Sequence, residues 1–406
     1  MRWLFFIWVL SMPFYQFSVV GSFSVDNILA PVLLFAWFAQ MTIGGGGVSA
    51  FQATNIVKSI VVAVFYFVAH IIGLIGTQEA IWHSAYLAAT NMLYFILPIL
   101  FIRSLSDLKK FKDAIIVVAI IASISGLLSA LGIIELEFAR QAESRIGVES
   151  LQKSIGVFSS YGDVGILLSL ALLAVIAKHK EKGSSLLYSY LRISAFIVIC
   201  LIAIISMQSR NVVLTIMAAL FAYWMIGYLM RISKNWNYIL YAVISLVAVF
   251  SVIIIILFSA PLLEFVQGIG GTKEAIGTVA SRLEQYNVMW NLVKDRAWIG
   301  VDPHVYEKHI NEINLTHNIW LKELVQGGVI TVLAMLIIFW RTLMVQVVNY
   351  RRGSESKDVR IFLSCVIGIL VATQFYPGGT LVFWCILGAC STMPLLVDKK
   401  LLEKKI

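Results

Sequence analysis

Long runs of uncharged apolar residues recur along most of the chain. Segments such as 114–134, 211–230 and 238–258 carry no charged side chain over about the 20 residues that a helix needs to cross ~30 Å of hydrocarbon. A membrane β-barrel would show short strands of alternating polarity instead. The pattern therefore predicts an all-α polytopic membrane protein.

We expect about twelve transmembrane helices in a single membrane domain that takes in residues 1–406. The spans lie near residues 3–20, 27–43, 56–76, 81–102, 113–134, 161–178, 189–207, 211–230, 237–258, 319–341, 360–376 and 379–397. The first one lacks a convincing small-residue cleavage site, so we expect a retained helix rather than a cleaved signal.

Two connections are long enough to fold on the membrane surface, and they cover residues 135–160 and 259–318. Within the second connection, apolar residues recur at spacings of three and four, which predicts an amphipathic helix lying in the membrane interface. These residues are Val279, Leu283, Tyr286, Trp290 and Val293.

Composition agrees with this assignment and adds an orientation. Hydrophobic residues make up 60% of the 406 positions and charged residues 13%, whereas soluble domains carry about 25% charged residues. With both termini placed in the cytoplasm, 21 of the 31 lysines and arginines fall in inner loops, as the positive-inside rule requires. The net charge of +9 thus reflects topology, and nucleic acid is not expected as a partner.

The positions of the cysteines and the absence of metal-binding motifs limit the kinds of site that we expect. All four cysteines fall within predicted spans, which excludes disulfides in the outer loops. No Asp-x-Asp or His-Glu-x-x-His pattern occurs, so neither a metal nor another cofactor is expected. His70 and His83 lie in or at the ends of spans, where we expect packed or interfacial side chains.

Arg210 and Arg282 are candidate ligands for a phosphate group on the outer side. Arg210 stands in a tight turn before the eighth span, and Ser281 and Glu284 have capping-box spacing, which places Arg282 on the first turn of a helix. A guanidinium binds phosphate through a bidentate fork that lysine cannot copy. The alternative for Arg210 is a side chain that snorkels to lipid phosphates.

His317 and Asn318 stand where the tenth span begins. A histidine titrates near neutral pH, and a helix N-terminus favours bound anions, so His317 suits either a general base or a diphosphate ligand. The alternative is an interfacial polar residue beside a membrane-belt tryptophan. Arg145 and Tyr161 flank the re-entry of the first outer loop into the membrane, where Arg145 could equally be a solvated loop charge.

The order and spacing of these motifs between about residues 145 and 330 resemble the O-antigen ligase and O-antigen polymerase family of bacterial inner-membrane glycosyltransferases. The resemblance rests on 147–165, Ser209-Arg210, 282–300, His317-Asn318 with Leu321, and Gly327-Gly328. It implies a GT-C-like fold and metal-independent transfer of a glycan carried on undecaprenyl diphosphate, with the active site on the periplasmic face.

By this resemblance, Arg210, Arg282 and His317 are catalytic, and Arg145, Tyr161 and Asn318 contact the substrate together with the two arginines. The implied partners are an undecaprenyl-diphosphate-linked oligosaccharide, a glycan or lipid A-core acceptor, membrane lipids and a chain-length regulator. A polymerase of repeat units is the leading interpretation, and a ligase acting on lipid A-core is the alternative. A lipid-linked oligosaccharide flippase is a further alternative, although neither half of the chain repeats the other.

Overall fold

The computed structural model describes thirteen stretches of the chain. They are residues 2–14, 18–20, 23–43, 50–73, 81–134, 154, 157–158, 160–178, 186–232, 288–301, 318–351, 356–373 and 381–392. The named helices are α1 (Arg2–Ser11), α2 (Val25–Ile43), α3 (Ala50–Gly73), α4 (Ile81–Phe101), α5 (Leu105–Ala130), α6 (Tyr161–Lys178), α7 (Leu186–Met207), α8 (Arg210–Ile232), α13 (Ile319–Arg351), α14 (Ser356–Ala372) and α15 (Leu381–Cys390).

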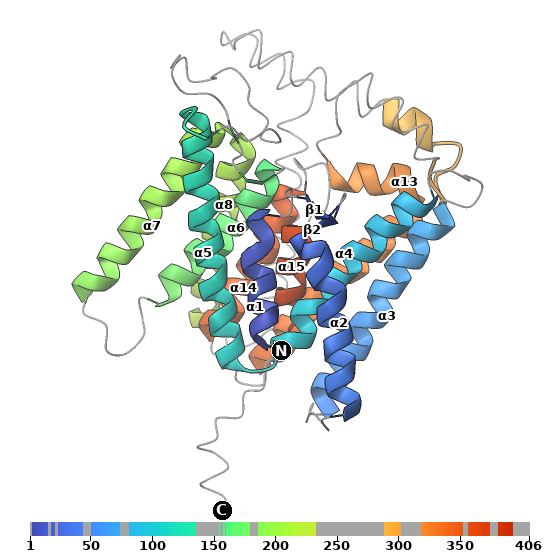
Figure 1. Cartoon of the computed structure of the whole chain (residues 1–406), viewed down its shortest axis with the longest axis horizontal. Coiled ribbons are helices and arrows are strands. Elements are labelled where there is room, and N and C mark those ends of the chain that lie inside the picture. Colours follow the sequence, from blue (N-terminus) through green and yellow to red (C-terminus); the bar gives the residue numbers. More distant parts are fainter. Residues whose placement is uncertain are drawn as a thin grey trace, which may run out of the picture.

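These helices form one bundle of a multi-pass membrane protein (Figure 1). Among the described residues, six helices are long and apolar enough to cross a bilayer, namely Gln52–Ile72, Leu105–Ala130, Tyr161–Lys178, Leu187–Met207, Asn211–Arg231 and Ile319–Arg351. The nearly all-helical architecture confirms the fold class, while the count of twelve spans remains a prediction. The expected ninth span, 237–258, lies outside the described residues.

The first expected span is wrong. Instead of one helix over residues 3–20, α1 ends at Ser11, a 3₁₀ turn follows at Met12–Phe14, and the chain forms a short hairpin of β1 (Ser18–Val20) and β2 (Phe23–Ser24). Pro13 explains the end of the helix, since proline cannot donate a backbone hydrogen bond and disfavours helical geometry in the residue before it. At ten residues, α1 is about 15 Å long, half the thickness of the hydrocarbon core.

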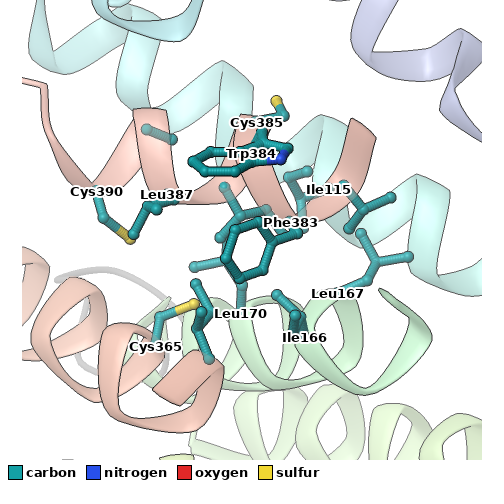
Figure 2. Close-up of a cluster of buried hydrophobic side chains, with 14 of the residues drawn as sticks. Ile115, Ile166, Leu167, Leu170, Cys365, Phe383, Trp384, Cys385, Leu387 and Cys390 are labelled. Carbon is teal, nitrogen blue, oxygen red and sulfur yellow. The ribbon is translucent and has the colours of Figure 1, made fainter. Parts of the chain in front are cut away.

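The core lies where α6 and α15 run through the middle of the bundle between α5 and α14. Every residue of α15 is buried, as is nearly every residue of α6. Figure 2 shows Phe383 and Trp384 of α15 packed over Ile166 and Leu170 of α6, with Ile115 of α5 beside them. Helices that are apolar on all sides belong in such a position.

The four cysteines lie in helices, as predicted. Cys200, Cys365, Cys385 and Cys390 are buried and unpaired in α7, α14 and α15. All four belong to the hydrophobic core, and Figure 2 shows Cys365, Cys385 and Cys390 within it. They act here as small apolar side chains.

Ion pairs gather at the end of the bundle that the charge distribution predicts to be cytoplasmic. Ser104 and Asp107 form a capping box at the start of α5, and Arg2 lies 3.4 Å from Asp107. Lys112 of α5 pairs with Asp358 of α14 at 2.6 Å. These contacts fix the first turns of α1, α5 and α14 against one another.

The tenth expected span, 319–341, also needs correction. The helix α13 reaches Arg351, and Gly328 breaks it with non-helical angles of φ 68° and ψ −169°. Residues 319–327 form a short first segment, and residues 329–351, about 35 Å long at 1.5 Å per residue, suffice to cross the hydrocarbon. The 319–327 segment is therefore a separate piece at the N-terminal end of the helix.

Candidate functional site

The structure describes some of the expected site residues and not others. Arg145, Arg282 and His317 lie outside the described residues. Arg210 is the first residue of α8, and its side chain is also outside what is described. Asn318 and Tyr161 are described, so the structure tests the framework around the expected site.

The starts of α6 and α8 lie next to the end of α14. A methyl group added to Gly165 of α6 would lie 3.2 Å from Val212 Cα of α8. On α14, a methyl group added to Gly368 would lie 3.0 Å from Ala219 Cβ of α8. Small residues allow such close helix approach in membranes. Tyr161 and Arg210 begin α6 and α8, and Thr373 directly follows α14, so their backbones share one end of the bundle.

The turn that precedes Arg210 is held by Ser154. Gln208 adopts a left-handed conformation with φ 46°, which reverses the chain between α7 and α8. The carbonyl of Ser206 accepts a hydrogen bond of 3.1 Å from the backbone N–H of Ser154. Ser154 also donates from its hydroxyl to Ser129 Oγ of α5 at 2.8 Å. Ser154, which precedes Tyr161 by seven residues, therefore lies beside the turn that carries Arg210.

The start of α13 is anchored to the end of α14. Asn318 caps the helix, because its Oδ1 accepts the N–H of Leu321 at 3.1 Å. Ile319 donates its N–H to the carbonyl of Thr373 at 3.1 Å, and Trp320 Nε1 donates to Thr373 Oγ1 at 2.9 Å. Asn318 thus has a capping role that the sequence analysis did not assign, and its contact with substrate remains a prediction.

The break in α13 is filled by the backbone of residues 297–301. In an unbroken helix, Val329 N–H would bond to Val325 O. Here Val329 donates to Ala297 O at 2.8 Å, and Val325 O accepts from Val301 N–H at 2.7 Å. Inserting residues 297–301 satisfies both groups that the break exposes. Residues 297–301 and the helix that follows His317 are thereby joined through their main chains.

An apolar contact between residues 288–293 and α13 supports this junction. Residues 288–293 are helical, as predicted. Val293 is fully buried, but Trp290 is 58% exposed, and Met289 takes its place against Val325 of α13. Met289 and Val293 stand four residues apart on one side of a helix, and docking onto α13 decides that this side faces inward. The part of the expected helix before residue 288 lies outside the described residues.

Sequence reasoning missed a polar cluster between α3 and the 319–327 segment. Glu323 Oε2 lies 2.8 Å from His70 Nε2 and 3.0 Å from Tyr66 Oη, and all three residues are buried. Packing of His70 agrees with the expectation, but its partner was not foreseen. The available signals were an acidic residue inside an apolar stretch and a Tyr–His pair at helical spacing.

Within the described ranges, no group of three or more histidine, cysteine or acidic side chains is arranged to hold a metal ion. Residues 195–336 match a family model described as O-antigen ligase. The match begins in α7, takes in the turn at Arg210 and the second outer loop, and ends within α13. No curated protein matches the chain in sequence.

Proposed function

We propose that the chain, whose residues 195–336 match the O-antigen ligase family model, is a metal-independent glycosyltransferase that polymerises repeat units of a surface polysaccharide. The donor in this proposal is a glycan on undecaprenyl diphosphate. The reaction takes place on the periplasmic face of the bacterial inner membrane, with both termini in the cytoplasm. A chain-length regulator is a proposed partner.

The insertion of residues 297–301 into the break of α13 carries this proposal. It joins the loop that contains Arg282 to the helix whose start follows His317. At the same end of the bundle, Arg210 opens α8, and Thr373 links the start of α13 to α14, which packs on α8. This arrangement supports a shared site for residues that the chain separates by more than a hundred positions.

In the proposed reaction, an acceptor hydroxyl attacks the anomeric carbon of the donor. A glycosidic C–O bond forms, the bond to the diphosphate breaks, and the diphosphate leaves with the bonding electron pair. Arg210 and Arg282 stabilise its growing negative charge as preorganised donors, a contribution on the order of 3 kcal/mol for each lost contact. His317 takes the proton of the acceptor hydroxyl, which is worth roughly 10² to 10⁴-fold in rate, or else orients the diphosphate. Arg145, Tyr161 and Asn318 contact the glycan.

A ligase that transfers the finished glycan to lipid A-core is the second candidate, because the matching family model carries the ligase description. A deletion strain separates the two. A polymerase mutant leaves single repeat units attached to the core, and a ligase mutant leaves no attached glycan. The strain complemented with the wild-type gene serves as the control.

A reconstituted assay tests the transfer itself and the flippase alternative. Purified protein in liposomes is given the undecaprenyl-diphosphate-linked repeat unit that accumulates in the deletion strain, with and without EDTA. We expect longer lipid-linked glycans in both cases. Movement of the unit across the bilayer without any change in its length would refute the enzyme, and activity that EDTA abolishes would refute metal independence.

A further inference from the structure

Three buried polar side chains meet between α3 and the 319–327 segment of α13. Tyr66 Oη lies 3.0 Å from Glu323 Oε2 and 2.9 Å from His70 Nε2, and His70 Nε2 lies 2.8 Å from the same carboxylate oxygen. The side chains of Glu323 and His70 are 6% and 10% exposed. Such buried groups do not reach a substrate from solvent, and the proposed reaction does not use them.

The partners of Glu323 are held rigidly on α3. Tyr66 and His70 stand four residues apart, so they lie on one face of that helix, with ring centroids 4.7 Å apart. On its other side, the ring of Tyr66 packs against Trp384 of α15 at 5.2 Å. The two donors therefore present a fixed pair of directions to the carboxylate.

Stability alone is a poor reason for this arrangement. Removing a carboxylate and an imidazole from water carries a large desolvation penalty, and well-packed apolar side chains often serve as well or better. What hydrogen bonds add is direction, because they weaken steeply when the donor and acceptor move out of line. The cluster thus fixes the position of Glu323 relative to α3. An apolar contact would define this position less closely.

We propose that Glu323 and His70, assisted by Tyr66, are positioning residues for glycan transfer. Their contact holds the middle of the 319–327 segment, whose start is tied to Thr373 and whose end receives residues 297–301. Asn318 precedes Glu323 by about 7.5 Å of helix, so a shift at the cluster moves the neighbourhood of His317 directly. The inference rests on the proposed function.

The test compares disruptive and conservative changes in the reconstituted assay with the lipid-linked repeat unit. We expect Glu323→Leu and His70→Leu each to lower kcat by about 10²-fold with little change in KM, since misplacement of about 1 Å has that effect. Glu323→Gln keeps an acceptor oxygen for both donors and should stay within severalfold of the wild type. The double variant His70→Leu/Glu323→Leu should regain thermal stability but not kcat.

Arg341→Leu is the matched control. Arg341 Nη2 donates to Asn55 Oδ1 at 2.6 Å and to Ser59 Oγ at 2.8 Å, joining the same two helices at their other end. We expect this variant to lose thermal stability while its folded fraction keeps the wild-type kcat. If Glu323→Leu does not fold, Tyr66→Phe removes a single donor, keeps the ring on Trp384 and should lower kcat with unchanged KM.

Three outcomes would overturn the inference. One is a wild-type kcat for Glu323→Leu. If the Glu323→Leu variant does not fold, a wild-type kcat for Tyr66→Phe has the same meaning. Another is a loss of transfer activity that is proportional to the unfolded fraction of the variant, as we expect for Arg341→Leu. The third is Glu323→Gln as inactive as Glu323→Leu, which would assign the carboxylate charge itself to the reaction. Absence of transfer by the wild-type protein would instead refute the proposed function.

Discussion

Gly300 and Gly328 lie against each other at the break in α13, both in the left-handed region with φ of 77° and 68°. A Cβ on Gly300 would come within 2.5 Å of Val325 O and 2.8 Å of Gly328 N. On Gly328 it would come within 2.2 Å of Trp298 O. Only glycine combines this backbone conformation with so close an approach of two chains.

Replacing Gly300 with alanine should therefore weaken the junction and abolish glycan transfer. The control is Gly132→Ala, because Gly132 has a similar φ of 69° but nothing within 4 Å of an added Cβ. The control should lose only about 1–2 kcal/mol from left-handed strain and remain active. Thermal unfolding and surface-glycan gels measure the two effects. Equal behaviour of the two variants would argue against a role for the junction.

Arginine substitutions test the diphosphate site. We expect Arg210→Ala and Arg282→Ala each to lower the transfer rate by 10²-fold or more, and lysine to restore little because it lacks the bidentate fork. Arg231→Ala is the control, since Arg231 is an exposed arginine at the other end of α8. Rates come from the reconstituted assay after membrane insertion is checked by immunoblot. Wild-type rates for both alanine variants would remove these arginines from the site.

His317→Ala should likewise abolish transfer while the protein still inserts into the membrane, because both proposed roles need the imidazole. His309→Ala is the control, since the spacing of His309 fits neither a metal pair nor the family motifs. The glycan pattern of complemented deletion strains reports the outcome. A normal pattern with His317→Ala would contradict both roles.

Asn318 offers a way to separate capping from substrate contact. Asn318→Ala removes the cap of α13 and should lower the free energy of unfolding by about 0.5–2 kcal/mol, whereas Asn318→Ser keeps a capping oxygen and should fold normally. If Asn318 also contacts the glycan, the serine variant will be stable but will have a raised KM. Thermal unfolding and KM distinguish the cases. A serine variant with wild-type KM would leave Asn318 a capping role alone.

The orientation predicted from the basic residues can be tested by labelling introduced cysteines. The four native cysteines are buried, so they should contribute little background labelling. Exposed single-cysteine positions exist at both ends of the bundle, namely Asp295 in the second outer loop and Ser106 on the first turn of α5. In intact spheroplasts, a membrane-impermeant maleimide should label Asp295→Cys and not Ser106→Cys. The reverse pattern would invert the topology and place the site in the cytoplasm.

Much of the fold follows from the sequence because each spanning helix must satisfy its own backbone hydrogen bonds in lipid, which makes long apolar runs a reliable signal. The exceptions have local causes. Pro13 ends α1 early, and Gly328 breaks α13 in a place where apolar periodicity continues on both sides. Hydropathy averages over such single residues, so it predicts the spans 3–20 and 319–341 with bounds that differ from those of the helices.

The sequence by itself determined the membrane class of this protein, the positions of most helices and the buried cysteines, and it predicts a set of residues with the chemistry for binding a diphosphate. Only the tertiary structure decided that residues 297–301 complete the broken helix, that Thr373 anchors its start and that Glu323 pairs with His70. These contacts join chain positions between 24 and 253 residues apart. They depend on where packed helices bring backbone and side-chain groups together, which no local pattern of residues encodes.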